Sequence, residues 1–424
     1  MTRRSAYAVL AVASALPRLI ALAYERADVT SAYVDKGDTF AQTFLANGTY
    51  GFIPDIPSAY TQPLYGFFLI PLYWLFDRHW LVIGVAQVAV AVATAVLVFE
   101  LARRLIDRRG ALLAALLTTV HPYLVWHDVH MNREILDHFL AVAAVLLTVV
   151  VAEGRPAATS RLLLANGALG VALGLMILGN VRTLFVPLVL AAYIVWRRGW
   201  TAAPAIVLGV AALVVAPWIA RNDVSVGCAA ITTDARALWK ANNEHTLETL
   251  RAGKWIDDVP LAGTPPSPQD AHAIYERTGR VARTDECAQM RFYRERAFDF
   301  VREQPAEKAA LALYGAKLLW QPWVFQTEGR PGRGTWLDLG RSVAEPAFMI
   351  VVYALALVGA TRVPRHFAVL ALALLAYQTL TAMAFVGATR YRVPWDFLVL
   401  IFAAAGLVAL WDRVRPQQRP GATA

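Results

Sequence analysis

Residues 80–102 read WLVIGVAQVAVAVATAVLVFELA, a run in which Glu100 is the only charged side chain. A helix needs about 20 consecutive apolar residues to cross a hydrocarbon core about 30 Å thick, so this run predicts a membrane-spanning helix. The whole chain agrees, because 58% of its residues are hydrophobic and 17% are charged, far from the profile of a soluble globular protein. The sequence therefore predicts an integral membrane protein.

Similar apolar runs recur along the chain and predict ten spans in all. They lie at 6–24, 80–102, 110–127, 135–152, 161–178, 183–196, 200–220, 344–361, 366–388 and 393–411. Two shorter apolar stretches, 63–76 and 308–323, are expected to be re-entrant or interfacial. If residues 63–76 crossed the membrane, the basic loop 103–109 would lie outside, against the tendency of such loops to stay cytoplasmic. The expected fold class is an all-α polytopic membrane protein.

The same rule fixes the expected topology. Pro17 and Arg18 interrupt the apolar core that a signal peptide needs, which favours an uncleaved signal anchor. With the basic loops inside, both termini are expected in the cytoplasm. The expected location is the inner (plasma) membrane. The expected parts are a transmembrane module at 1–220 with a first outer loop at 25–79, an extracytoplasmic lobe with the interfacial helix at 221–343, and C-terminal helices at 344–424. Basic cytoplasmic loops account for the net charge of +9, and we find no nucleic-acid-binding motif.

Both cysteines, Cys228 and Cys287, lie in the expected lobe. Disulfides persist in extracytoplasmic compartments, so the pair is a disulfide candidate; the alternative is two unpaired thiols in the largest polar segment.

Several arginines lie at the expected outer ends of spans, where positive charge is disfavoured. Any one of them could be a snorkelling side chain, but together they indicate an anionic ligand, because the guanidinium fork matches phosphate oxygens. This set consists of Arg133, Arg182, Arg221, Arg390 and Arg392.

Acidic residues are expected on the same face. They are Asp35, Asp38, Asp128 and Glu134. A carboxylate can take a proton from an attacking hydroxyl while cations stabilise a departing phosphate, so the combination suits group transfer from a phosphate ester. The alternative is that the acids form structural salt bridges with the arginines.

An ordered series of motifs resembles GT-C-type glycosyltransferases, in the protein-mannosyltransferase-like branch (glycosyltransferase families 39 and 83). The motifs are DKGDTFA (35–41), LANGTY (45–50), SAYTQPLY (58–65), Arg103-Arg104, Arg133-Glu134, PWIARN (217–222), LWKANN (238–243) and YRVP (391–394). The resemblance implies an inverting transferase that moves a sugar from a polyprenyl-phosphate carrier to an extracytoplasmic acceptor, which could be a glycolipid, a cell-envelope glycan or a protein. Relatives often read LWxGNNP where this chain has LWKANNE, which leaves the sugar contacts of Asn243 open.

The resemblance implies that Asp35 is the catalytic base and that Glu134 or Asp128 is the second acidic residue. Asp38 is the further catalytic candidate. Arginines and Lys317 would hold the leaving phosphate, and Tyr60 and Trp239 would stack on a sugar ring or an isoprenoid tail. A divalent cation, Mg²⁺ or Mn²⁺, could be ligated by the carboxylates of Asp35, Asp128 and Glu134, although the sequence establishes no cofactor.

A transporter or flippase of lipid-linked sugars is the alternative of a different class. Transporters typically contain internal repeats or broken helices at the membrane midplane, and we find neither in the sequence. The identities of the sugar, the acceptor and the carrier, and the oligomeric state, stay open.

Overall fold

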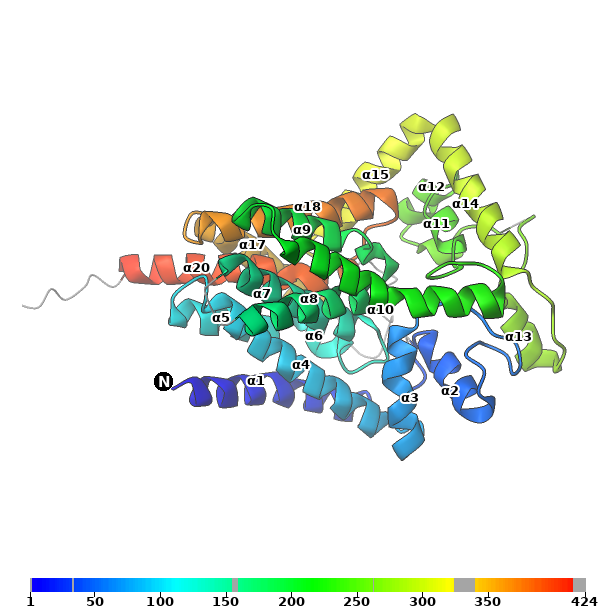
Figure 1. Ribbon diagram of the computed structural model, residues 1–424, viewed down its shortest axis with the longest axis horizontal. Helices are drawn as coiled ribbons and strands as arrows, with labels where there is room; N and C mark the ends of the chain where they lie inside the picture. Colours follow the sequence, from blue (N-terminus) through cyan, green and yellow to red (C-terminus); the bar gives the residue numbers. More distant parts are fainter. Residues whose placement is uncertain (1, 33, 155–158, 262, 324–339, 415–424) are drawn as a thin grey trace, which may run out of the picture.

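The computed structural model describes residues 2–32, 34–154, 159–261, 263–323 and 340–414. Across these residues the protein is helical, and the only extended pairing there is an isolated bridge between Ile53 and Ile56. Most of the long helices run side by side in one bundle (Figure 1). They are α1 (Arg3–Tyr24), α4 (Trp80–Ala102), α5 (Arg108–Thr119), α7 (Glu134–Glu153), α8 (Thr159–Gly179), α9 (Val186–Arg198), α10 (Ala202–Val226), α17 (Glu345–Gly359), α18 (Arg365–Ala384) and α20 (Asp396–Val414).

Eight helices in the described ranges are long and apolar enough to cross a membrane. They correspond to eight of the ten expected spans, and the expected all-α polytopic membrane fold is confirmed. The other two expected spans, 110–127 and 183–196, contain shorter helices. Residues 183–196 fall mainly on α9, and residues 110–127 are divided between α5 and α6 (Pro122–His127).

The break between α5 and α6 has a chemical cause. Pro122 has no backbone N–H to donate and disfavours a helical conformation in the residue before it, His121. The buried Arg18 side chain donates a hydrogen bond of 2.9 Å to the carbonyl of Thr119 at the end of α5. The same guanidinium forms an ion pair of 2.8 Å with Asp128. Arg18 therefore satisfies a broken helix end as well as a buried carboxylate.

Close backbone approach holds the C-terminal helices together. A Cβ atom at Gly406 of α20 would lie 2.9 Å from the backbone nitrogen of Gly359 of α17, and one at Gly359 would overlap the carbonyl of Phe402. Glycine leaves room for this contact, as small residues do at many helix interfaces in membranes.

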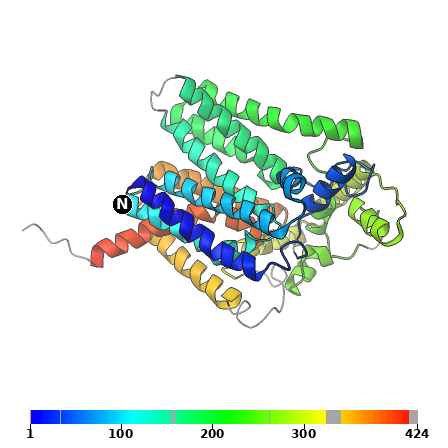
Figure 2. The same cartoon turned by 90° about the horizontal axis from the view of Figure 1, so that it is seen from below.

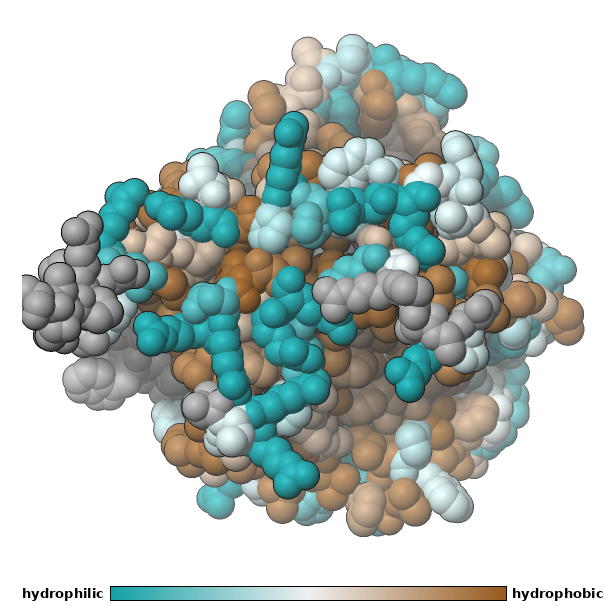
Figure 3. Space-filling view, turned by 60° about the vertical axis from the view of Figure 1, so that its left-hand side comes forward, coloured by the Kyte–Doolittle hydropathy of each residue, from teal (hydrophilic) through white to brown (hydrophobic). Residues whose placement is uncertain are grey.

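The two ends of the bundle differ. The N-terminus and the last turn of α20 lie at one end in both views (Figures 1 and 2). This end contains exposed arginines of the α4–α5 connection, such as Arg103 and Arg104, and Arg197 at the end of α9. These are the charges that the positive-inside rule would place in the cytoplasm. Figure 3, which brings this side of the molecule forward, shows hydrophilic side chains between apolar flanks.

The opposite end has short helices and the segment that we call the lobe, residues 228–303. The first loop contributes α2 (Gly37–Asn47) and α3 (Leu64–Phe76), and the lobe contains α11 (Arg236–Lys240), α12 (Thr246–Arg251), α13 (Pro268–Thr278) and α14 (Glu286–Glu303). The disulfide between Cys228 and Cys287 is present and joins the end of α10 to the start of α14. The predicted cysteine pairing is thus confirmed.

The stretch 308–323, expected to lie on the membrane surface, falls on α15 (Pro305–Trp320). This helix leads from the lobe back to the bundle, where it packs against α18 (Figure 1). Its Lys308 donates hydrogen bonds to Asn242 Oδ1 (2.6 Å) and to the carbonyl of Met383 (2.8 Å), and so links the lobe to the end of α18. The division of the chain after residues 220 and 343 stays a prediction, and residues 324–339 and 415–424 lie outside the described residues.

Candidate active site

A cavity of about 760 Å³ lies where the lobe meets the bundle. It is lined by the first loop, by residues 132–134 before and at the start of α7, by residues 180–182, by residues 385–391 and by the lobe. Its basic residues are Lys36, Arg133, Arg182, Arg236, Lys240 and Arg390, and its acidic residues are Asp35, Glu134, Asp234, Asp257 and Asp270. Segments far apart in the sequence thus place opposite charges around one space.

Asp35 is held at this cavity by its own backbone and by its neighbours. Its backbone N–H donates to the carbonyl of Met131 (2.9 Å), and its Oδ1 accepts a hydrogen bond of 2.8 Å from the N–H of Gly37. Position 37 leaves little room, because a Cβ there would lie 2.9 Å from Gly66 N and 3.1 Å from Asp35 Oδ1. The carboxylate is half-buried, and burial raises its pKa even though Arg133 opposes the shift. A raised pKa makes the ionised carboxylate a better proton acceptor.

Arg133 and Glu134 reach the cavity from the beginning of α7. Arg133 Nη1 donates a hydrogen bond of 2.6 Å to Oε1 of Gln62 in the first loop. Burial lowers the pKa of Arg133, but the carboxylates of Asp35 and Glu134 outweigh this effect and hold it above its ordinary value. The guanidinium therefore stays charged between two carboxylates.

Arg182 and Arg390 are held over aromatic rings. The guanidinium carbon of Arg182 lies 3.6 Å from the ring centre of Tyr391, and its Nη2 donates to the carbonyl of Val386 (2.9 Å). Burial lowers the pKa of Arg182 to about 10, which leaves it charged at neutral pH. Arg390 donates to the hydroxyl of Tyr391 (2.8 Å) and lies 5.2 Å from the ring centre of Trp255. We call Arg133, Glu134, Arg182 and Arg390 the bundle wall.

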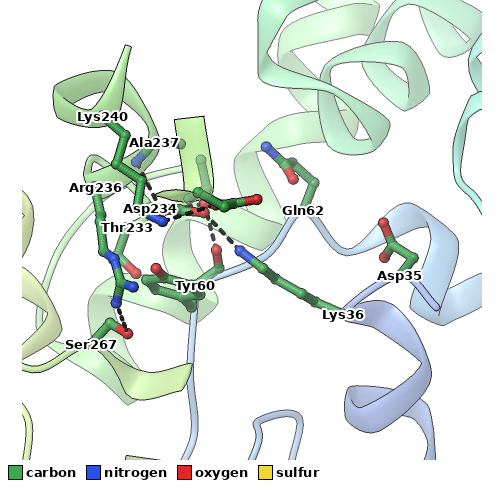
Figure 4. A network of polar contacts seen from close by, with 12 residues as sticks. Asp35, Lys36, Tyr60, Gln62, Thr233, Asp234, Arg236, Ala237, Lys240 and Ser267 are labelled. Carbon is green, nitrogen blue, oxygen red and sulfur yellow. Dashed lines mark hydrogen bonds and ion pairs between the residues drawn. The ribbon is translucent and has the colours of Figure 1, made fainter. Parts of the chain in front are cut away.

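The rest of the charged lining consists of three ion pairs, which we call the lobe wall. Lys36 Nζ lies 3.0 Å from Asp234 Oδ2, and its ammonium lies 4.6 Å from the ring centre of Tyr60. Figure 4 shows Lys36 extending to Asp234 while the neighbouring Asp35 carboxylate lies apart from that pair. The other two pairs are Arg236 with Asp270 (2.6 Å) and Lys240 with Asp257 (2.8 Å).

A buried carboxylate joins the lobe to the first loop. Glu286 Oε2, at the start of α14, accepts hydrogen bonds from the N–H of Ala59 (3.0 Å) and the hydroxyl of Thr233 (2.7 Å). The N–H of Thr233 in turn donates to the carbonyl of Ala59 (2.9 Å). These bonds set the path of the chain immediately before Tyr60 and Gln62, which both line the cavity.

Of the residues predicted from the sequence, six line the cavity. They are Asp35, Glu134, Arg133, Arg182, Arg390 and Tyr60.

The other predicted acids lie elsewhere. Asp38 is buried on the far side of the first loop, where it pairs with Arg78 (2.8 Å) and accepts from the hydroxyl of Tyr73 (2.6 Å). Asp128 pairs with Arg18. The sequence left open whether Glu134 or Asp128 is the second acid, and only Glu134 is a cavity residue.

Two of the predicted arginines have structural partners. Arg221 donates hydrogen bonds of 2.8 Å to the carbonyls of Ser58 and Tyr50 and thereby fixes the first loop. Arg392 is buried and forms an ion pair of 3.1 Å with Asp396.

The remaining predicted contacts also lie off the cavity lining. Trp239 packs against the ring of Tyr293, and Asn243 donates a hydrogen bond to the carbonyl of Trp239 (2.9 Å) within its own turn. Lys317 lies 5.3 Å from the ring centre of Tyr314 on its own helix.

The sequence reasoning missed the lobe wall. Lys36 could have been found, since it is the neighbour of Asp35 in the first motif. The lobe residues carried no comparable signal, because each charge looks like an ordinary surface residue until its partner from a distant segment is known. These missed residues are Lys36, Asp234, Arg236, Lys240, Asp257 and Asp270.

The expected metal ligands are not brought together. In the described part of the chain, no group of three or more His, Cys, Asp or Glu side chains is placed to hold a metal ion. Asp128 is engaged by Arg18, and Arg133 lies in the field of both Asp35 and Glu134. The three-carboxylate site for Mg²⁺ or Mn²⁺ does not fit this geometry, and we derive no catalytic step through a metal.

Comparison with known proteins gives a family match over part of the chain. Residues 60–220 match the family model described as dolichyl-phosphate-mannose-protein mannosyltransferase. A comparison with curated proteins finds no match.

Among solved structures, the chain is similar to the archaeal oligosaccharyltransferase AglB from Archaeoglobus fulgidus. The complex with an inhibitory peptide and a dolichol-phosphate has a TM-score of 0.57 at 14% identity, over 97% of this chain and 50% of that one. The structure tethered to an acceptor peptide containing the NVT sequon gives 0.55 at 14% identity, over 97% and 50%. The complex with Zn and sulfate gives 0.53 at 12% identity, over 96% and 49%.

The chain thus spans about half the length of these structures. The likeness shows a GT-C-type fold, and the resemblance to mannosyltransferase-like GT-C proteins that the motifs predicted is confirmed.

Proposed function

We propose that this protein is an inverting glycosyltransferase, which transfers a sugar from a polyprenyl-phosphate donor to a hydroxyl of an extracytoplasmic acceptor. The observation that carries the proposal is the cavity in which Asp35 lies beside a wall of arginines. The family match over residues 60–220 and the dolichol-phosphate in the complex of the similar AglB structure support a lipid-phosphate donor.

The reaction is a direct displacement. The acceptor oxygen forms a bond to the anomeric carbon while the bond from that carbon to the phosphate oxygen breaks on the opposite face. The proton of the acceptor hydroxyl passes to Asp35, and the bonding electrons leave with the polyprenyl phosphate. Atoms and charge balance without a further reactant.

Each part of the cavity has a role in this step. Asp35 accepts the proton, and its raised pKa suits a general base better than an ordinary aspartate would. Arg133, Arg182 and Arg390 stabilise the charge on the departing phosphate, an electrostatic effect that is strong because the groups are fixed before the reaction. Glu134 attracts the positive charge of Arg133 and accepts a hydrogen bond from a sugar hydroxyl.

The proposed function also implies an orientation of the protein in the membrane. The end with exposed arginines and both described ends of the chain would face the cytoplasm, and the cavity would open on the outer side of the inner (plasma) membrane. The disulfide between Cys228 and Cys287 supports this placement, because such bonds persist in oxidising compartments.

The deciding experiment uses Asp35→Asn protein in proteoliposomes with radiolabelled polyprenyl-phosphate mannose and other labelled polyprenyl-phosphate sugars. We expect transfer to fall by about 10² to 10⁴-fold, the usual contribution of a positioned base. The matched control is Asp55→Asn, because Asp55 is exposed in the same loop and has a φ of 61°, which asparagine also adopts readily. Undiminished transfer by Asp35→Asn would exclude Asp35 as the base.

A further inference from the structure

The two walls of the cavity differ in charge balance. In the described part of the chain no carboxylate lies within ion-pair distance of Arg133 or Arg182 of the bundle wall, although Arg133 lies in the field of Asp35 and Glu134. On the lobe wall, by contrast, Lys36, Arg236 and Lys240 each have a carboxylate within 3.0 Å. A phosphate is attracted to the first arrangement and gains little from the second, because each cation there is already neutralised.

The lobe wall also presents its carboxylates in front of two of its cations. The Asp257 side chain is 76% exposed and the Asp270 side chain 42%, whereas Lys240 and Arg236, behind them, are 7% and 10% exposed. The accessible groups on this wall are therefore mainly carboxylate oxygens, joined by the ammonium of Lys36, which is 35% exposed. They accept hydrogen bonds at several points and donate at one.

This pattern selects among ligand classes. An anionic ligand would meet carboxylate oxygens first, and a cationic ligand would compete with Arg236 and Lys240 for carboxylates that are already paired. A hydroxyl group has neither difficulty, since it donates to a carboxylate and accepts from an ammonium, and hydrogen bonds to charged groups are the stronger kind. Thr61 and Gln62 also line the cavity and add uncharged polar residues to it.

We propose that the lobe wall is the acceptor subsite and that it takes an uncharged, hydroxyl-rich glycan. This inference rests on the proposed function, since it names the acceptor class of the same cavity. Asp35 lines the same cavity as the lobe wall, so a glycan bound along that wall would have a hydroxyl within the space that the base also lines. The bonds made and broken are those of the displacement described above.

The first experiment measures binding without turnover. Saturation-transfer NMR on the full-length protein in nanodiscs uses mannotriose as the uncharged probe, mannose 6-phosphate as the anionic probe, chitotriose as the amine-bearing probe and a Ser/Thr-rich peptide. We expect saturation transfer to mannotriose, insensitive to added salt because no net charge is involved. Preferential binding of the phosphorylated, amine-bearing or peptide probe would overturn the proposal.

The second experiment measures transfer from labelled polyprenyl-phosphate sugar to the same acceptors. We expect Asp257→Asn and Asp234→Asn to raise the ratio of acceptor KM to donor KM by about tenfold, the effect of one charge-assisted hydrogen bond. Glu244→Gln, an exposed acid of the same lobe away from the cavity, is the matched control and leaves the ratio unchanged. An unchanged ratio in both cavity variants would overturn the subsite.

The two failures can be told apart. If the parent protein consumes no donor in any arm but binds mannotriose through Asp257, the proposed function fails and the glycan site stands. If it transfers sugar to the peptide and does not bind mannotriose, the transferase stands and the glycan subsite is excluded.

Discussion

The bundle wall and the lobe wall line one cavity, but they are constructed differently. Arg133 and Arg182 lie in the bundle wall outside the ion pairs of the described chain, and Arg182 lies against the ring of Tyr391 instead. Every cation of the lobe wall is within 3.0 Å of a carboxylate. The number of charges at a site therefore says less about its ligand than how many of those charges are already paired.

The largest effect on transfer should follow neutralisation of a bundle-wall arginine. We expect Arg182→Gln to lower sugar transfer and donor hydrolysis together by about 10² to 10³-fold, the usual effect of removing one fixed donor to a developing charge. In proteoliposomes with labelled polyprenyl-phosphate sugar, label on the acceptor measures transfer and free labelled sugar measures donor hydrolysis. Arg277→Gln, an exposed arginine of the lobe, is the control. An equal loss in the control would mean that general charge, and not the wall, attracts the donor.

The pH dependence of kcat/KM tests the role of Asp35 as the base. Asp35 must be ionised to accept a proton, and burial raises its pKa, so kcat/KM should fall about tenfold per pH unit below that raised pKa. The acid limb should therefore lie above the usual aspartate range near 3.9. Steady-state rates between pH 4 and 8 measure it. A limb that stays in place when Asp35 is replaced by Glu would assign the titration to another group.

A smaller loss of activity should follow removal of the hydrogen bonds by which Glu286 joins the lobe to the first loop. Glu286→Ala removes the acceptor of the Ala59 and Thr233 hydrogen bonds, and leaving buried donors unpaired costs about 1 to 3 kcal/mol. We expect about a tenfold loss of kcat/KM, since Tyr60 and Gln62 follow directly in the chain. Glu286→Gln keeps an acceptor oxygen at that position and should restore most of the rate. Failure of the glutamine variant to rescue would show that the charge itself is needed.

The smallest change in rate should follow loss of the disulfide. A cross-link acts mainly on the unfolded chain, so Cys228→Ser with Cys287→Ser should lower stability by about 2 to 4 kcal/mol while the folded geometry remains. We expect activity at low temperature close to that of the parent, with faster proteolysis of the lobe on warming. Limited proteolysis followed by mass spectrometry measures this. A large loss of activity at low temperature would mean that the disulfide shapes the cavity directly.

Asp35 and Asp38 show how far the sequence could be followed. Both are acids next to a membrane, and the same reasoning selected both. The motif ranked Asp35 first. Only the fold shows that Asp38 lies in the first turn of α2, where its carboxylate is bound by Arg78 and Tyr73. Residue type and position predict that a carboxylate needs a partner, and they do not predict which distant side chain will provide one.

The helices were the more predictable part. Apolar runs of about 20 residues specify spans because the bilayer fixes their length, and eight of the expected spans meet that criterion. The lobe wall depended on pairs such as Lys36 with Asp234, separated by nearly half the chain. No periodicity carries such a pairing, because it depends on tertiary packing.

The disulfide also has a consequence for the order of synthesis, export and oxidation of the chain. Arg133, Glu134 and Arg182 of the bundle wall precede both cysteines in the chain, and Arg390 follows them. In the proposed topology Cys228 must wait for Cys287 to be exported before the two can be oxidised. In that topology the cross-link between the end of α10 and the start of α14 therefore forms outside the cytoplasm. A newly made chain would acquire its cross-linked lobe only in the compartment into which the proposed cavity opens.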